Sequence, residues 1–213
     1  MKSKILVLLL AVSLLTACGS SGESQEKAPA EKSTAVETEQ AKETPAAEEK
    51  SSGSAADEYK ASFLSFVDEN SGQNFSNYQK SEKAYNFISA NPGMFPSSSD
   101  VYGPHLNPDL EFKHVTKDIT AVGEEFMAID GTVLSIYANP TESEGVEKVT
   151  ELEIVDSSFN YYNLVYFGEL PDIYSEDTVH AVFLPYALIS FPNQAGGSTV
   201  GILSYAAEVT KIQ

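Results

Sequence analysis

The period of the hydrophobic residues changes near residue 125, and this change constrains the fold more than any other feature. Before it, apolar residues recur at helical spacing, whereas after it they alternate with polar residues, as in half-buried strands. Five strands are predicted, at residues 126–137, 149–156, 161–167, 178–188 and 200–212. A tight turn at Ser157-Ser158 joins the second strand to the third. This pattern predicts an α+β chain that ends in a small, closed, five-stranded β-barrel.

Two helices are predicted ahead of the strands. The segment DEYKASFLSFVDEN (57–70) places Tyr59, Phe63, Phe66 and Val67 on one helical face. The second segment, NYQKSEKAYNFISANPG (77–93), ends at a clear Asn-Pro-Gly stop. Residues 94–110 are rich in proline and glycine and predict an irregular loop. We therefore expect a helical lead-in over 57–118 and the barrel over 119–213.

The strand segments resemble the OB-fold domains called tRNA-anti-like. The resemblance rests on GTVLSIYANP, VTELEIVDSSFNYYNLVYFGE, EDTVHAVFLPY and STVGILSYAAEV, and on AYNFISANPGMFP and HVTKDITAVGEEF in the lead-in, which resembles that of Gram-positive lipoproteins. It covers about 60 to 150 residues, depending on how much of the lead-in is accepted, and it rests on pattern because the fold has no invariant motif. The chain departs from it at Glu176-Asp177, where many members have Gly-Asp, and SH3-like and lipocalin-like barrels remain open.

The resemblance implies a binding region rather than specific residues. OB-folds bind oligonucleotides or oligosaccharides on the face of their second and third strands. In this chain that face would draw on Glu153, Tyr162 and Tyr166, with Glu151 as an alternative to Glu153. Both alternating sets of the third strand contain aromatic residues, so a role in the core competes with binding for these tyrosines.

The charge of the chain argues against nucleic acid as a partner. It has 31 Asp and Glu against 13 Lys and Arg, a formal net charge of −18 at pH 7. Phosphate binding requires clustered cations, because released counterions supply much of the affinity. We therefore expect no nucleic-acid partner, and the family name would describe the fold alone.

No motif of a known catalytic mechanism is present. The histidines His105, His114 and His180 lack HExxH, GxSxG or cysteine-histidine spacing, and no P-loop or GxGxxG sequence implies a nucleotide cofactor. The adjacent acids Glu124-Glu125 and Glu176-Asp177 could act as an acid and a base, but neighbouring residues usually point apart. We expect no catalytic residues, no enzyme activity and no cofactor.

Calcium is the one metal that the acidity makes reasonable, because it takes carboxylate and carbonyl oxygens. The candidate ligands are Asp172, Glu176 and Asp177, in the loop before the fourth strand. Their spacing matches no known calcium loop.

The N-terminus has the layout of a secretory signal. Lys2 and Lys4 precede an apolar run from Ile5 to Leu15, which is too short for the roughly 20 residues that span a bilayer. The following Leu-Thr-Ala-Cys sequence resembles the lipobox of bacterial lipoproteins. In that family the cysteine is alkylated with diacylglycerol and becomes the new N-terminus. The resemblance implies a signal peptide at 1–17 and a lipid on Cys18, the only cysteine; an uncleaved membrane helix is the alternative.

Residues 18–56 are expected to form a disordered acidic tether. Val36 is the only large apolar residue after Leu15 and before Tyr59, so the segment cannot bury enough surface to offset the entropy of ordering. A helical stalk is the alternative. Such tethers resemble those of Gram-positive surface lipoproteins.

Together these features predict a lipid-anchored protein on the extracytoplasmic face of the cell membrane. Its expected function is non-catalytic binding of a glycan, a peptide or another envelope protein. The alternatives are a structural or assembly factor of an envelope complex and, less favoured, an envelope hydrolase that uses paired carboxylates.

Overall fold

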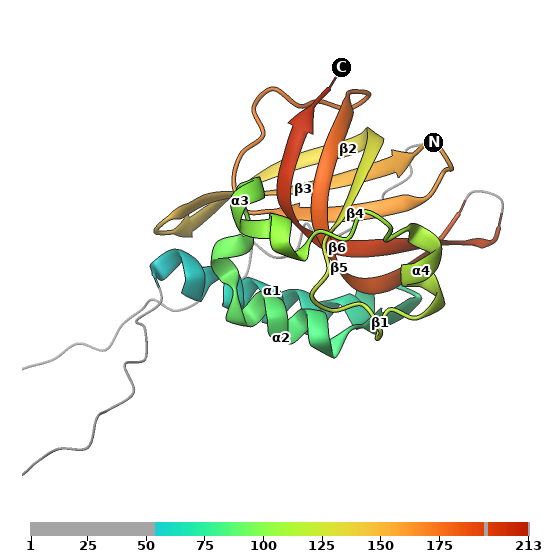
Figure 1. Cartoon of the computed structure of the whole chain (residues 1–213), viewed down its shortest axis with the longest axis horizontal. Coiled ribbons are helices and arrows are strands. Elements are labelled where there is room, and N and C mark those ends of the chain that lie inside the picture. The colour runs from blue at the N-terminus through green and yellow to red at the C-terminus, as the bar shows by residue number, and fades with distance from the viewer. Residues whose placement is uncertain (1–53, 194–195, 213) are drawn as a thin grey trace, which may run out of the picture.

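The structure is a computed structural model and describes residues 54–193 and 196–212. The predicted signal peptide, Cys18 and nearly all of the predicted tether lie outside these residues. The described part is α+β (Figure 1). Its helices are α1 (Ala55–Asn74), α2 (Glu82–Ala90), α3 (Ser99–Tyr102) and α4 (Phe112–Lys117), with 3-10 turns η1 (Pro92–Met94) and η2 (Gly103–His105). Its strands are β1 (Asn77–Lys80), β2 (Met127–Ser143), β3 (Val146–Asp156), β4 (Tyr161–Tyr166), β5 (Thr178–Pro192) and β6 (Ser198–Lys211).

The first helix begins two residues inside the predicted tether. Ser54 caps it: the Ser54 hydroxyl accepts from the Asp57 N–H, and the Asp57 carboxylate accepts from the Ser54 N–H. This reciprocal arrangement satisfies backbone donors that the first helical turn would otherwise leave unpaired. The last two residues of the predicted tether, Ala55 and Ala56, are thus part of α1.

The second predicted helix is shorter than expected. Its first four residues, Asn77–Lys80, form β1, which pairs antiparallel with β5, and Ser81 then caps α2. Exposed and half-buried residues alternate in this stretch, and pairing with β5 gives its backbone hydrogen-bond partners. The predicted loop at 94–110 also contains the short helix α3 and the turn η2.

Six strands form one sheet in the order β1-β5-β2-β3-β4-β6, and β5 also pairs with β6. All of these pairings are antiparallel except that of β4 with β6, which is parallel. The five predicted strands are confirmed as β2 to β6, with β2, β3 and β5 longer than predicted. At Gly131, a Cβ atom would lie 2.4 Å from Ile154 Cγ2, so the close approach of β3 requires glycine.

Two clusters of buried side chains lie on opposite faces of the sheet, because successive strand residues point to opposite sides. The helix-side cluster contains Phe63, Leu64 and Val67 of α1 and Ile88 of α2, packed with residues of β3 to β6. The inner cluster contains residues such as Leu152, Ile154, Leu164 and Phe183 from the other face, together with Val115 of α4. Figure 1 shows α1 and α2 together at one side of the sheet, next to β1 and β5.

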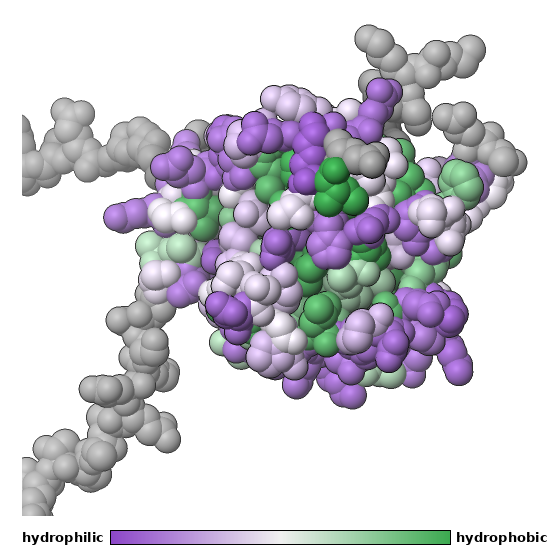
Figure 2. All heavy atoms as spheres, turned by 45° about the horizontal axis from the view of Figure 1, so that its top comes forward, coloured by the Kyte–Doolittle hydropathy of each residue, from purple (hydrophilic) through white to green (hydrophobic). Residues whose placement is uncertain are grey.

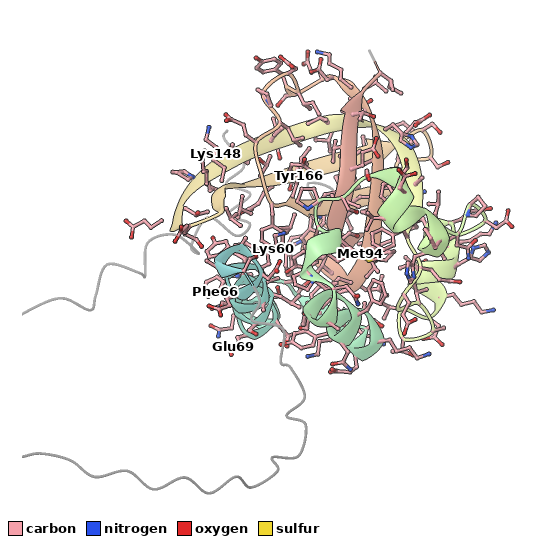
Figure 3. All side chains as sticks on the ribbon, turned by 60° about the vertical axis from the view of Figure 1, so that its left-hand side comes forward. Lys60, Phe66, Glu69, Met94, Lys148 and Tyr166 are labelled. Carbon is pink, nitrogen blue, oxygen red and sulfur yellow. The ribbon has the colours of Figure 1, made fainter. Side chains whose placement is uncertain are left out.

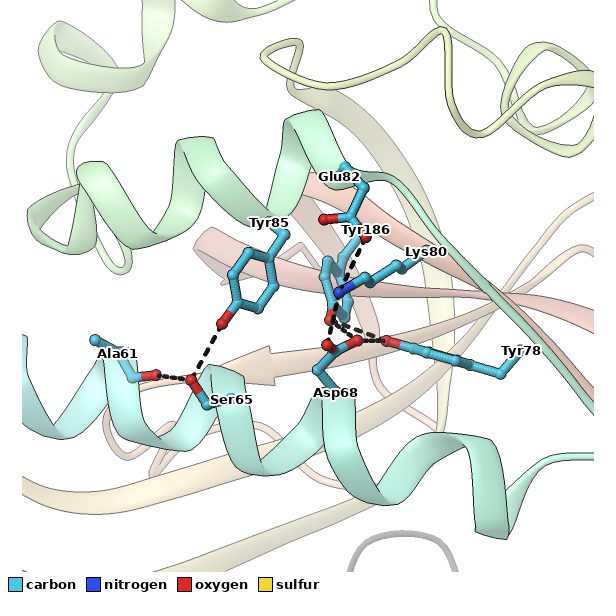
Figure 4. Close-up of polar contacts among 8 residues, drawn as sticks. All are labelled: Ala61, Ser65, Asp68, Tyr78, Lys80, Glu82, Tyr85 and Tyr186. Atoms are coloured by element: carbon cyan, nitrogen blue, oxygen red, sulfur yellow. Dashed lines mark hydrogen bonds and ion pairs between the residues drawn. The ribbon is translucent and has the colours of Figure 1, made fainter.

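A polar network connects α1 to the sheet (Figure 4). The Asp68 carboxylate accepts from the hydroxyls of Tyr78 and Tyr186 at 2.8 and 3.0 Å and from Lys80 Nζ at 2.7 Å. Burial alone would raise the pKa of Asp68, but these hydrogen bonds outweigh it and hold the pKa below its usual value.

Figure 3 shows Lys60 on the sheet side of α1, where its ammonium lies 5.9 Å from the centre of the Phe167 ring.

Hydrophilic residues make up most of the face drawn in Figure 2, with hydrophobic ones showing between them. Within the described residues, no helix combines the length and the hydrophobicity that crossing a bilayer requires.

Candidate functional site

Two glutamates lie side by side on the outer face of β3. Glu151 and Glu153 are two residues apart, so both side chains point away from the inner cluster that Leu152 and Ile154 join. The register places Tyr137 and Ser135 of β2 opposite them on one side, and Asn163 of β4 opposite Glu153 on the other. We call these five residues (Ser135, Tyr137, Glu151, Glu153 and Asn163) the acidic face.

Glu151 lies where the helix-covered part of the sheet ends. Its neighbours Val149, two residues before it on β3, and Val165, opposite it on β4, belong to the helix-side cluster. Burial raises the pKa of Glu151 to about 7, and the charge of Glu153 adds to the rise. Asn139 Nδ2 donates to Glu151 Oε1 at 3.3 Å. The side chain therefore exchanges its proton near neutral pH, which is unusual for a glutamate.

The other residues of the acidic face offer groups for contact with a ligand. Tyr137 is 54 % exposed, whereas Glu153 is half-buried and accepts from the Ser135 hydroxyl at 2.8 Å. Asn163, on the other side of Glu153, is buried, with only 7 % of the residue exposed. The face thus combines an exposed aromatic ring with two half-buried carboxyl groups.

The structure separates the three residues predicted to bind. Glu153 lies on the outer face, but Tyr162 and Tyr166 are on the inner side of β4, opposite Ile154 and Thr150. Tyr162 is 1 % exposed and packs against Phe112 and Phe183, with ring centroids 5.6 and 5.5 Å apart. The prediction of an exposed platform is therefore wrong for Tyr162, whereas Tyr166 on the same side of the strand is half-buried. The strand alternation turns Tyr161, Asn163 and Val165 outward instead.

Tyr137 was missed because it falls in the first predicted strand, outside the region that the resemblance indicated. The first predicted strand ends at Tyr137. β2 instead continues through Asn139-Pro140 to Ser143, and the long β2–β3 pairing brings Tyr137 opposite Glu151.

The predicted calcium ligands do not converge. The Asp177 carboxylate accepts from Lys211 Nζ at 2.8 Å and from the Tyr174 N–H at 2.7 Å, and Asp172 contributes its backbone carbonyl to the same ammonium at 3.4 Å. A lysine ammonium thus occupies the place that the prediction gave to a cation. Over residues 54–193 and 196–212, no three side chains of His, Cys, Asp or Glu form a group that could hold a metal ion.

Glu176 keeps the turn where the resemblance expected glycine. Its φ is 76°, in the left-handed region, and its N–H donates to the Val133 carbonyl at 2.8 Å. The backbone therefore keeps a conformation that suits glycine, although the side chain departs from it.

In comparisons with known proteins, no family model, curated protein or solved structure matches this chain.

Proposed function

We propose that this chain is a lipid-anchored, non-catalytic binding protein on the extracytoplasmic face of the membrane, and that it binds envelope glycans through the acidic face. The observation that carries the proposal is Glu151, a half-buried carboxyl group with a pKa of about 7 on an outer sheet surface. Shifted pKa values concentrate at functional sites, because burial and like charges are costly unless something is gained from them.

An OB-like barrel is the fold proposed for β2 to β6. The pairings run from β5 through β2, β3, β4 and β6 and return to β5. The parallel pair of β4 and β6 supports an OB-like arrangement over the lipocalin-like one, because an up-and-down barrel pairs its successive strands antiparallel. In an OB-fold, the acidic face would lie on the strands that bind oligosaccharides.

The chemistry of the face favours a neutral sugar. An exposed tyrosine ring can stack on the apolar face of a pyranose, while carboxylate groups pair with its hydroxyls. The net charge of −18 opposes polyanions such as nucleic acids and sulfated glycans. A glycan with acetamido and hydroxyl groups fits both conditions.

The proposed anchor is a diacylglycerol on Cys18. Its support is the lipobox-like sequence that ends at the only cysteine of the chain. Two acyl chains would hold the protein stably on a membrane where a single chain would not.

The test of the glycan site is a titration of the whole chain with a tetramer of N-acetylglucosamine. Replacing Tyr137 by alanine should weaken binding about 10-fold, which corresponds to one aromatic contact of about 1.4 kcal/mol. The matched control is Tyr174→Ala, since Tyr174 is 63 % exposed but lies outside the acidic face. Glu153→Gln should also weaken binding.

Binding that is equally reduced by both tyrosine substitutions would remove Tyr137 from the site. Absence of binding to the tetramer, with a folded protein, would overturn the glycan proposal.

A further inference from the structure

A pocket of about 410 Å³ opens beside β2, and several of its lining residues, such as Leu110, Met127 and Tyr162, belong to the inner cluster. It lies between residues 108–113, the first residues of β2 and the turn that joins β3 to β4. Leu110, Phe112 and Met127 supply apolar walls, and Asn160 and Tyr162 supply polar groups. Its volume is in the range of pockets that bind small ligands, about 300 to 1,000 Å³.

The backbone of β2 runs along this pocket with part of its edge unpaired. At one end of the edge, the Phe126 N–H donates to the His105 carbonyl and the Phe126 carbonyl accepts from the Asn107 N–H, both at 2.9 Å. At the other end, pairing with β3 begins at Gly131, opposite Asp156. Neither partner extends over the residues between.

The direction of the backbone groups follows from the alternation of a strand. Val133 exchanges hydrogen bonds with Glu176 and Asp177, which immediately precede β5, so odd-numbered residues here direct their N–H and C=O toward β5. Phe126 directs its groups to the other side, and Ala128 must do the same. The Ala128 N–H and C=O therefore face the pocket, and neither has a hydrogen-bond partner among the described residues.

The turn beside the pocket is held in place without a ligand. The Asp156 carboxylate accepts from the N–H groups of Ser158 and Asn160, from Asn160 Nδ2 and from the Tyr162 hydroxyl, at 2.8 to 3.0 Å. Phe159 lies between two residues that line the pocket and is 82 % exposed, with φ of 61°. An exposed aromatic side chain in a strained conformation at a pocket rim is a feature of contact sites.

We propose that this pocket binds a neutral or basic peptide in an extended conformation, one residue of which pairs with the N–H and C=O of Ala128. A neighbouring donor and acceptor on a strand edge match the N–H and C=O of one residue of an added strand. The added strand would occupy the unpaired edge of β2 between the segment at Asn107 and the start of β3 pairing at Asp156. The net charge of −18 disfavours an acidic peptide. Phe159 would cover one side chain of the peptide at the rim. This site is separate from the acidic face and does not depend on it.

Hydrogen exchange of the Ala128 amide in the whole chain is the direct test. Without a ligand, the Ala128 N–H should exchange faster than those of Met127 and Ile129, which face β5. The probe is a tetrapeptide of alternating lysine and valine with blocked ends, at about ten times its dissociation constant, which we expect on the order of 1 mM. It should slow exchange at Ala128 about 10-fold. The same peptide with its central amides N-methylated should not, because it cannot form the ladder pair.

Two substitutions at Ala128 distinguish the loss of its backbone hydrogen bond to the peptide from an increase in side-chain volume. Ala128→Pro removes only the N–H that faces the pocket, as proline does on the open side of an edge strand, whereas Ala128→Val adds similar bulk and keeps the N–H. Peptide binding, followed by chemical shifts at Asn160, should be lost with proline and kept with valine. If the proline variant fails to fold, the exchange of the Ala128 amide in the natural chain still tests whether the peptide pairs there.

Three results would overturn the proposal. The first is slow exchange at Ala128 without any peptide, since the edge would then be paired already. The second is exchange that neither the lysine-valine peptide nor an all-neutral valine-threonine peptide slows. The third is slowing by the N-acetylglucosamine tetramer but by neither peptide, which would identify the ligand as a sugar amide.

Discussion

At the scale of single residues, Glu151 is the group whose ionisation should be visible in the stability of the protein. Its pKa is about 7 in the folded chain because it is buried beside Glu153, whereas a glutamate in the unfolded chain has a pKa of about 4.3. Between these two values the folded state holds the proton more tightly. This contribution to stability is present below pH 4 and is lost as the pH rises through about 7.

We predict that Glu151→Gln removes this loss. The free energy of unfolding of the natural chain should fall on the order of 2 kcal/mol between pH 4.5 and 7.5, and the variant should fall much less. Urea unfolding at a series of pH values measures the difference. Equal slopes in the two proteins would mean that Glu151 titrates normally.

Glu176 is a non-glycine residue whose backbone lies in the left-handed region. Left-handed backbone costs a non-glycine residue roughly 1 to 2 kcal/mol, and glycine in the unfolded chain costs less than 1 kcal/mol of entropy. We therefore predict that Glu176→Gly stabilises the protein by about 0.5 to 1 kcal/mol. The matched control is its exposed neighbour Ser175, which is not in the left-handed region, so that Ser175→Gly should destabilise the protein. Thermal unfolding of the two variants decides, and stabilisation by both or by neither would contradict the argument.

At the scale of elements, the network around Asp68 holds α1 against the sheet. It joins the middle of α1 to β1 through Tyr78 and Lys80 and to β5 through Tyr186. Tyr78 and Lys80 follow α1 closely in the chain, but Tyr186 is 118 residues after Asp68, so the complete network forms only when β5 has folded against α1 and β1. Removing the carboxylate would leave the Tyr186 hydroxyl without its acceptor, whereas the Tyr78 hydroxyl keeps the Tyr186 hydroxyl as a partner at 2.9 Å.

We predict that Asp68→Ala lowers the free energy of unfolding by about 2 kcal/mol, the usual cost of leaving such groups unsatisfied. Glu69→Ala is the control, because Glu69 is exposed on α1 and should change stability by less than about 0.5 kcal/mol (Figure 3).

Hydrogen bonds depress the pKa of Asp68. The contribution of Asp68 to stability is therefore present above its unfolded pKa and is lost as the pH falls through its folded pKa. Asp68→Asn should therefore lessen the acid sensitivity of the protein below pH 4, measured by urea unfolding at pH 2 to 6.

At the scale of the whole molecule, the proposed lipid anchor, the glycan site and the peptide site belong to different parts of the chain. The acidic face and the pocket occupy opposite sides of β3 and β4, because Glu153 points outward and Tyr162 inward. A ligand at one site would therefore leave the other free. This arrangement suits a protein that holds a glycan and a peptide at the same time.

We predict that Cys18→Ala moves the protein from the membrane fraction to the soluble fraction of cells that express the whole chain. The acyl chains supply the membrane affinity, at about 0.8 kcal/mol for each buried CH₂ group. Fractionation with radioactive palmitate labelling measures both the location and the modification. A natural chain that is unlabelled and soluble would contradict the anchor, and Lys27→Ala in the predicted tether is the control that should change neither.

Much of the fold could be predicted because strands and helices have different periods. The alternation after residue 125 predicted all five strands from β2 to β6, and Asn91-Pro92-Gly93 placed the end of α2 correctly. The sequence could not indicate that Asn77–Lys80 is a strand. Four residues are too few to establish a period, and only the edge of β5 offers them a partner.

The candidate site was less predictable, because a strand pattern with aromatic residues in both alternating sets does not show which set faces out. The sequence by itself determined the acidic character of the chain, the succession of strands along the chain and the position of Glu153 on a strand. Only the tertiary structure decided that Tyr162 lies inside and Tyr137 opposite Glu151, and that Ala128 faces a pocket with an unpaired backbone. Side-chain direction within a strand is local, but the side that becomes the core depends on how distant strands pair and on where the helices pack.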